Sequence, residues 1–173
     1  MNHYKTERLI LEYANEKDAE ELFPIWSDYE VTQFTMVKNI NGIDDCKARI
    51  NRQIGWGIDN SIGPLIIREN GKAIGYCGGR KNEMNEIEIF YHIVKEKWGS
   101  GFGTEIVKAM IWIGFKEKKA VRILAEAAIE NIASWKVLEK AGMKRVGTKA
   151  GEFENREGIH DLYEYEIQSD MEE

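Results

Sequence analysis

Apolar side chains alternate with polar ones in some stretches of the chain and recur every three or four residues in others. The alternating stretches predict strands, because successive strand residues face opposite sides, and the longer period predicts amphipathic helices. The predicted strands are 9–13, 65–69, 72–79, 86–94, 121–127, 144–149 and 158–167, and the predicted helices are 15–26, 43–56, 100–118 and 131–140. The sequence therefore predicts a mixed α/β domain.

Turn-forming residues separate these stretches. Asn70-Gly71 lies between two strand patterns and predicts a tight hairpin. Asn15 is a suitable cap for the first helix, Pro24 is expected to kink or end it, and Gly142 is expected to end the last helix. The last two strands are expected to pair in antiparallel fashion. The predicted order is antiparallel strands first, followed by a strand-helix-strand-helix unit.

Length and hydrophobicity predict one domain over residues 1–173, because a chain of 173 residues with 43% hydrophobic residues can bury a single core. No apolar run approaches the roughly 18 residues that span a bilayer, and the N-terminal segment lacks the apolar stretch of a signal peptide. We therefore expect a cytoplasmic protein with no membrane partner. The last few residues, which include Asp170, Glu172 and Glu173, are expected to be frayed.

Charge and cysteine usage exclude some classes of function. The net charge of −6, from 24 basic and 30 acidic residues, argues against a nucleic-acid partner and is compatible with a cationic amine substrate. Cys46 and Cys77 lack the spacing of a metal site or redox pair, so we expect two free, buried thiols. The histidines, His3, His92 and His160, are scattered, so no metal site is expected.

The most informative stretch is a strand pattern, 89–94, that leads into a glycine-rich turn and a helix beginning near Ser100. Gly99, Gly101 and Gly103 allow a ligand to approach the backbone closely. The first amides of a helix have no intrahelical acceptor, and together with the helix dipole they favour an anion. The turn lacks the spacing of a nucleotide-hydrolysing loop or of a dinucleotide-binding loop. It predicts a phosphate-binding site of another kind, although a glycine-rich turn can also simply begin a helix.

Several blocks of sequence resemble one known family in the same order. The turn resembles the [Gln/Arg]-x-x-Gly-x-[Gly/Ala] loop of GNAT-superfamily N-acetyltransferases, and its Trp-Gly-x-Gly-aromatic-x-Thr-Glu form resembles the RimJ/RimL branch, which acetylates protein N-termini. The resemblance covers nearly the whole chain, in blocks at 6–11, 18–22, 71–76, 88–105, 131–134 and 138–143. It implies a single-domain fold with a mostly antiparallel, twisted central sheet flanked by helices.

The resemblance also implies acetyl-CoA as cosubstrate. The pyrophosphate would lie on the turn formed by Gly99, Ser100, Gly101, Phe102, Gly103 and Thr104. In the family the preceding strand separates from its neighbour and its last amides hold the pantetheine arm; here these residues are His92, Ile93 and Val94, and we expect contacts from Ile93 and Val94. Asn131 and Ser134, which are also a plain helix cap and its third residue, would contact the coenzyme.

For catalysis, Glu88 matches the family's strand glutamate, which takes a proton from the amine directly or through water. The alternative interpretation is that Glu88 and Glu86, which share a face, are simply solvated or bind a cation. Many family members use a tyrosine on the last helix as general acid, but Leu138 occupies that position here. This departure favours Ser134 as a hydrogen-bond donor to the departing sulfur.

Two further tyrosines, Tyr163 and Tyr165, lie on the last predicted strand, where they would either replace the missing acid or pack in the sheet. The expected acceptor is a protein N-terminal α-amine, which is neutral far more often than a lysine side chain at pH 7.5. A small amine such as a polyamine, an aminoglycoside or an amino acid is the enzymatic alternative, and a non-catalytic acyl-CoA-binding module is the alternative of another class. The chain is expected to be a monomer or a homodimer.

Overall fold

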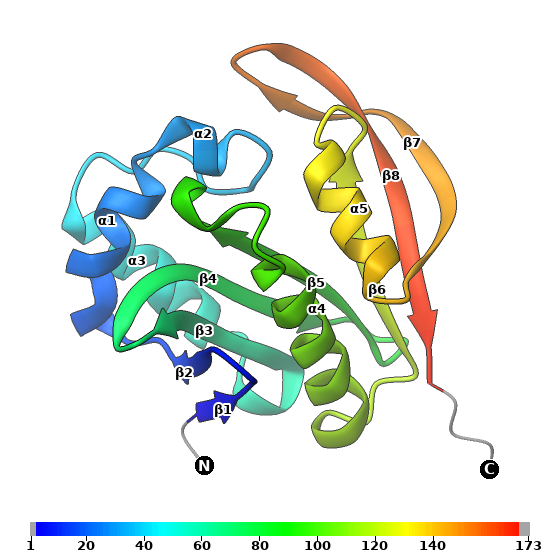
Figure 1. Cartoon of the computed structure of the whole chain (residues 1–173), viewed down its shortest axis with the longest axis horizontal. Helices are drawn as coiled ribbons and strands as arrows, with labels where there is room; N and C mark the ends of the chain where they lie inside the picture. Colours follow the sequence, from blue (N-terminus) through cyan, green and yellow to red (C-terminus); the bar gives the residue numbers. More distant parts are fainter. Residues whose placement is uncertain (1–2, 170–173) are drawn as a thin grey trace.

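The computed structural model describes residues 3–169, and within them eight strands form one continuous sheet with helices on both faces (Figure 1). The strands are β1 (His3–Lys5), β2 (Ile10–Tyr13), β3 (Ser61–Glu69), β4 (Lys72–Lys81), β5 (Glu86–Ile93), β6 (Arg122–Ala128), β7 (Lys144–Asn155) and β8 (Gly158–Gln168). The α-helices are α1 (Ala19–Trp26), α2 (Tyr29–Thr32), α3 (Ile43–Ile54), α4 (Phe102–Trp112) and α5 (Ile132–Lys140). The predicted α/β class with a mostly antiparallel sheet is confirmed.

Strand order across the sheet is β1-β2-β3-β4-β5-β6-β8-β7. All neighbours pair antiparallel except β5 and β6, which are parallel and are joined through α4. The hairpin between β3 and β4 turns at Asn70 and Gly71, both with positive φ, as the Asn-Gly pattern predicted. The predicted antiparallel pair at the C-terminal end is also present, as β7 and β8.

Two hydrophobic clusters hold the layers together, one on each face of the sheet. One cluster lies between the sheet and α4 and includes Ile89, Ile93, Ile106 and Met110. The other lies between the opposite face and helices α1 and α3. Figure 1 shows α4 and α5 on the near face and α3 behind the sheet. Because β5 runs through the middle, its alternate residues face different layers.

Parallel pairing of β5 with β6 is short. Only 86–88 of β5 pair with 122–124 of β6, although β5 continues to Ile93 and β6 to Ala128. Beyond Glu88 and Leu124 the two strands separate, and each keeps its antiparallel neighbour on the other side. The sheet therefore opens between its two halves, as the resemblance implied.

Several predicted boundaries differ from the structure. Pro24 does not end α1, which continues to Trp26, while Asn15 caps a short 3₁₀ turn, Glu16–Asp18, just before it. The long helix ends at Trp112 and continues as a π-helical turn, Ile113–Glu117. The sequence pattern also misses β1 and α2, which are too short for a clear periodicity. These differences lie at element ends and leave the topology unchanged.

Candidate active site

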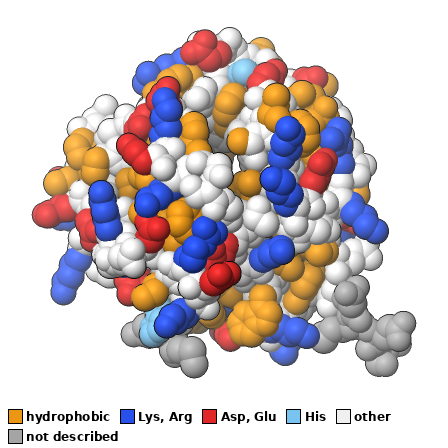
Figure 2. All heavy atoms as spheres, in the orientation of Figure 1, with side chains coloured by type: hydrophobic (Ala, Val, Ile, Leu, Met, Phe, Trp, Pro, Cys, Tyr) orange, Lys and Arg blue, Asp and Glu red, His pale blue; other side chains and the backbone are white. Residues whose placement is uncertain are grey.

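The opening between β5 and β6 leads into a cavity of about 950 Å³. Residues of β5 and β6, the α2–α3 segment, α3, the start of α4, and α5 line it. Figure 2 shows the hollow in the upper part of the molecule, with basic side chains over α5 beside it; Lys136 and Lys140 of α5 line the cavity. A cavity of this size can hold an extended ligand that passes between the two halves of the sheet.

One end of the cavity is the glycine-rich turn. Gly99 and Gly101 have φ values of 72° and 81°, which lie in the left-handed region that favours glycine. Gly101 is the N-cap of α4, and the first helical hydrogen bond runs from the Glu105 amide to the Gly101 carbonyl at 3.1 Å. The amides of Phe102, Gly103 and Thr104 therefore have no intrahelical acceptor, and they form an anion-binding helix N-terminus.

The turn is fixed from outside by the N-terminal segment. The Arg8 guanidinium donates to the Ser100 carbonyl at 2.9 Å and to Glu105 at 2.7 Å, and it stacks on the Phe102 ring at 4.1 Å. Thr6 donates to the same carboxylate at 2.5 Å. These contacts hold the first turn of α4 rigid, so its amides are already oriented.

Not every predicted residue of the turn faces the cavity. Gly99, Gly101, Gly103 and Thr104 line it. Ser100 is exposed, and the side chain of Phe102 is buried in the core beneath Arg8. For Ser100 and Phe102 the structure therefore leaves only backbone groups available to a ligand in the cavity.

The amides of β5 divide between two directions. The Val94 amide donates to the Ile74 carbonyl of the neighbouring segment at 2.8 Å. Since amides alternate along an antiparallel ladder, those of His92 and Phe90 also face β4, whereas those of Ile93 and Tyr91 face the opening toward β6. Ile93 lines the cavity and Val94 does not. Of the two predicted contact residues, only Ile93 has an amide directed at the opening.

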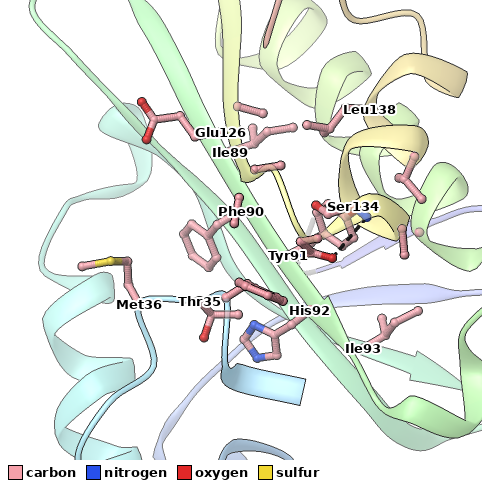
Figure 3. Close-up of a pocket in the computed structure, with 18 of the residues that line it drawn as sticks. Thr35, Met36, Ile89, Phe90, Tyr91, His92, Ile93, Glu126, Ser134 and Leu138 are labelled. Carbon is pink, nitrogen blue, oxygen red and sulfur yellow. Dashed lines mark hydrogen bonds between the residues drawn. The ribbon is translucent and has the colours of Figure 1, made fainter. Parts of the chain in front are cut away.

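At the opposite wall, Asn131 caps α5 by accepting the Ser134 amide at 3.4 Å, and both residues line the cavity. The Ser134 hydroxyl lies 3.5 Å from the hydroxyl of Tyr91, which reaches across the opening from β5. Figure 3 shows Tyr91 turned toward Ser134, and Phe90 turned to the other side of the strand. The sheet opening is thus bridged by two hydroxyl groups.

Tyr91 is a site residue that the sequence reasoning missed. It belongs to the strand 89–94, for which the sequence predicts a role of the backbone amides, and the alternation 89, 91, 93 on one face of the strand is the signal that points to it. Burial raises the pKa of Tyr91 to about 12, and the hydrogen bond with Ser134 opposes that shift. Tyr91 therefore keeps its proton at neutral pH and is a hydrogen-bond donor.

Glu88 lies at the point where β5 and β6 separate, open to the cavity. Burial by the surrounding walls raises its pKa, the negative charge of Glu126 adds to this, and Lys149 opposes it. No ion pair of Glu88 occurs among residues 3–169. A carboxylate with a raised pKa and no cation partner is suited to accept a proton.

Glu86 has a different environment from Glu88, although the two share a strand face. It is buried and pairs with Arg122, and it also accepts from Asn82 at 2.8 Å. The hydrogen bonds from Asn82 and then Arg122 lower the pKa of Glu86. The interpretation of Glu86 and Glu88 as one solvated pair is therefore wrong, because Glu86 is a buried partner of β6.

The two tyrosines of β8 lie outside the cavity. Tyr165 is buried, donates to Glu139 at 2.9 Å and accepts from Arg145 at 3.2 Å. Tyr163 packs against Trp135 and under the Arg145 guanidinium, 3.8 Å from its ring centre. These contacts agree with the alternative that both tyrosines pack in the sheet.

His92 faces the α1 and α3 layer and accepts a hydrogen bond on Nε2 from the Trp26 indole at 2.7 Å. Burial, with the nearby positive charge of Arg49, lowers the pKa of His92 to about 3. Its ring is therefore neutral near pH 7 and positions Trp26 instead of exchanging protons.

Other predicted features can be checked within residues 3–169. Cys46 and Cys77 are free and buried, as expected, and burial raises the pKa of the Cys46 thiol to about 11. Among these residues no group of three or more His, Cys, Asp or Glu side chains could hold a metal ion. None of their helices is long and apolar enough to cross a membrane.

With the site described, comparison with known proteins identifies the family. The model of the acetyltransferase (GNAT) domain matches residues 8–144, which is most of the chain. The chain belongs to the GNAT acetyltransferase family. The glycine-rich turn and the opening between β5 and β6 lie inside the matched residues. The chain is an N-acetyltransferase.

Individual GNAT relatives agree with this result. The chain is 30% identical over 154 residues to the uncharacterised N-acetyltransferase YoaA of Bacillus subtilis, covering 83% of each protein. A GNAT-family acetyltransferase structure from Bacillus anthracis is 25% identical with a TM-score of 0.82, covering 96% of this chain and 98% of that one. The structure of RimL, a ribosomal L7/L12 α-N-protein acetyltransferase in complex with coenzyme A, has a TM-score of 0.87 at 14% identity, covering 96% and 97%. At that identity, the RimL match shows a shared fold.

Proposed function

We propose that this GNAT enzyme transfers an acetyl group from acetyl-CoA to an α-amine, with a protein N-terminus as acceptor. The observation that carries the proposal is the strand opening, which puts Glu88 at its closed end and the Tyr91–Ser134 pair across it. The identity of the acceptor goes beyond the N-acetyltransferase activity of the family, and it is this identity that we propose. It also follows the RimJ/RimL-like form of the turn, and RimL shares this fold.

The residues present fit coenzyme A. The free amides of Gly103 and Thr104 and the dipole of α4 suit a pyrophosphate group. Lys136 and Lys140 line the same cavity and suit a further phosphate. The amide of Ile93 faces the opening, where it can donate to a thioester or pantetheine carbonyl. When bound, acetyl-CoA supplies the activated acetyl group.

Glu88 would take the proton from the attacking amine, directly or through one water molecule. Its raised pKa brings it closer to that of an α-amine and makes proton transfer less unfavourable than for an ordinary carboxylate. Glu88 and Tyr91 are three residues apart on one strand and therefore face opposite layers. The amine enters from the α3 side, and the sulfur leaves toward α5.

The Tyr91 hydroxyl would stabilise the departing sulfur by donating a hydrogen bond, with Ser134 holding its orientation. The pKa of Tyr91, about 12, is well above the roughly 8.5 of a thiol, so full proton transfer to the thiolate would be uphill. The thiolate would instead leave hydrogen-bonded and take its proton from solvent. This role replaces the helix tyrosine, whose position Leu138 occupies.

An α-amine suits a single weak base. With a pKa near 8, roughly a quarter of such amines are neutral at pH 7.5, whereas a lysine side chain near 10.4 is neutral about once in a thousand. The difference corresponds to about 3 kcal/mol. Among residues 3–169, Glu88 is the cavity carboxylate with both a raised pKa and no cation partner, so an acceptor that is already partly neutral fits best.

The test is coenzyme A release from acetyl-CoA with peptides that have free N-termini, and with spermidine and Nα-acetyl-lysine for comparison. We expect turnover with peptides and a kcat/KM at least about tenfold lower for the other amines. A preference for spermidine would indicate that the acceptor is a small amine and not a protein N-terminus. Coenzyme A binding by calorimetry with no turnover for any amine would overturn the proposal in favour of an acyl-CoA-binding module.

A further inference from the structure

Three arginines line the acceptor side of the cavity and have no carboxylate partner among residues 3–169. Arg49 and Arg52 lie on α3, and Arg80 lies near the end of β4. Of the other arginines in residues 3–169, four are paired with glutamate or aspartate, namely Arg8, Arg68, Arg122 and Arg145, and Arg156 instead lies over the Tyr29 ring. In a chain with a net charge of −6, unpaired cations at one wall of a cavity point to an incoming anion.

Arg80 shows this most clearly. It lies directly across from Glu88 in the β4–β5 ladder, so the two side chains leave the same face of the sheet. Its guanidinium nevertheless stacks on Trp56, 5.7 Å from the ring centre, and makes no ion pair with Glu88. Both charges remain available, one for an amine and one for an anionic group close to it.

Arg49 is held in place with most of its donors unused. One of its NH₂ groups donates to the Met36 carbonyl at 3.1 Å, and its guanidinium lies 5.6 Å from the ring centre of Trp26. Its Nε is buried and has no hydrogen-bond partner among the described residues. Burial, with repulsion from Arg52, lowers the pKa of Arg49. Arg49 and Arg52 repel each other in this arrangement, so an anion that binds between them is favoured.

Arg80 lies away from the predicted coenzyme phosphates. Arg80 is level with Glu88, five residues before the end of β5 at Ile93, which corresponds to about 16 Å of strand. The turn and the lysines Lys97, Lys136 and Lys140 lie beyond that end, around α4 and α5. The positive charge of Arg80 is therefore separate from the predicted phosphate region and lies beside Glu88, on the side where the amine is proposed to enter.

We propose that the acceptor of this enzyme carries a carboxylate or phosphate group close to its amine, and that Arg49, Arg52 and Arg80 bind that group. This inference rests on the proposed acetyl transfer and adds a requirement to its acceptor, an anionic group near the amine. The anionic group is either the α-carboxylate of a free amino acid, an acidic side chain next to a peptide N-terminus, or a phosphate on a small amine. The inference disfavours polyamines as acceptors, because the arginines repel their additional positive charge.

Matched pairs of amines separate these sources. Coenzyme A release is measured with alanine and alaninamide, with peptides beginning Ala-Asp and Ala-Asn, and with phosphoethanolamine and ethanolamine. We expect the anionic member of at least one pair to have a kcat/KM at least about tenfold higher, and the pair identifies the source. Arg52→Gln and Arg80→Gln should reduce that ratio toward one. Arg156→Gln, an equal charge change outside the cavity, should leave it unchanged.

A second measurement does not depend on turnover. With coenzyme A saturating its own site, malonate and inorganic phosphate are titrated by calorimetry into the wild type and the arginine variants. We expect binding that Arg52→Gln and Arg80→Gln weaken at least about tenfold and Arg156→Gln does not. Equal or better use of neutral or cationic amines, or anion binding that is absent or unaffected by the variants, would overturn the inference. Absence of turnover with every amine, together with arginine-dependent anion binding, would instead overturn only the proposed acetyl transfer.

Discussion

The hydroxyl of Tyr91 on β5 lies 3.5 Å from the hydroxyl of Ser134 on α5, across the opening where the sheet separates. The two residues are 43 positions apart in the chain and belong to two walls of the cavity. A polar pair in this position connects the coenzyme side of the sheet to the helix that Asn131 caps. In the mechanism that we propose, Tyr91 supplies the hydrogen-bond donor that Leu138, at the position of the family's helix tyrosine, lacks.

Tyr91→Phe should therefore reduce kcat by about 10- to 100-fold and leave coenzyme A affinity within about threefold, since only a transition-state hydrogen bond is removed. Tyr163→Phe, which changes a tyrosine outside the cavity, is the matched control. Steady-state kinetics with coenzyme A calorimetry measure both effects. If Tyr91→Phe retains the wild-type kcat, Tyr91 does not assist departure of the sulfur.

Glu88→Gln should lower kcat/KM for the amine by about 10²- to 10⁴-fold, the usual contribution of a general base. The raised pKa of Glu88 also predicts that wild-type kcat/KM falls on the acidic side as Glu88 becomes protonated. Glu88→Gln should lose the part of the acidic fall that Glu88 causes and keep only the part caused by protonation of the amine itself, whereas Glu83→Gln, on an exposed turn, should retain both. An unchanged acidic limb in Glu88→Gln would assign the titration to another group.

Gly101→Ala should weaken coenzyme A binding by about tenfold, because a side chain at a φ of 81° costs about 1–2 kcal/mol and displaces the turn. Calorimetry of coenzyme A binding measures the change. Gly42→Ala is the control, since Gly42 caps α3 with extended backbone and open space at its Cβ. Wild-type affinity in Gly101→Ala would show that the turn does not hold the coenzyme.

Glu105→Gln should destabilise the fold by about 2 kcal/mol at pH 7, because it replaces a charged acceptor of hydrogen bonds from Thr6 and Arg8. Burial raises the pKa of Glu105, but these hydrogen bonds more than offset it and the net shift is downward. A lowered pKa adds stability that is present above the ordinary value of 4.5 and is lost as pH falls through the folded-state value.

Thermal unfolding of wild type and Glu105→Gln across pH 7 to pH 3 tests this prediction. The difference between the two proteins should be largest near neutrality and should shrink below pH 4.5. The thermal stability of Glu83→Gln should equal that of wild type at both ends of the pH range. A gap between Glu105→Gln and wild type that stays constant with pH would indicate lost packing instead of a lost charge.

Much of the fold could be predicted from the sequence because its signals are local. The Asn70-Gly71 hairpin, the glycine-rich turn and the cap at Asn131 each depend on residues close in the chain, and each appears in the structure. The free, buried state of Cys46 and Cys77 followed from the absence of partners at a ligand spacing. Family membership followed from several such signals in one order.

The parts that could not be predicted depend on contacts between distant segments. Glu86 and Glu88 have the same spacing and residue type, but Arg122 from the next strand neutralises Glu86 and leaves Glu88 free. In the sequence, Tyr91 resembles the apolar residues around it in the strand, and only the packing of α5 places Ser134 next to its hydroxyl. The direction of the Val94 amide depends on its pairing with Ile74, which the pattern of one strand does not determine.

The most direct test of the account uses one peptide with a free N-terminus and an internal lysine. The peptide is incubated with acetyl-CoA and wild type, Glu83→Gln or Glu88→Gln, and the acetylated position is located by fragment mass spectrometry. The account predicts one acetyl group on the α-amine with wild type and Glu83→Gln, and little product with Glu88→Gln. Acetylation of the lysine side chain, or equal product from Glu88→Gln, would contradict it.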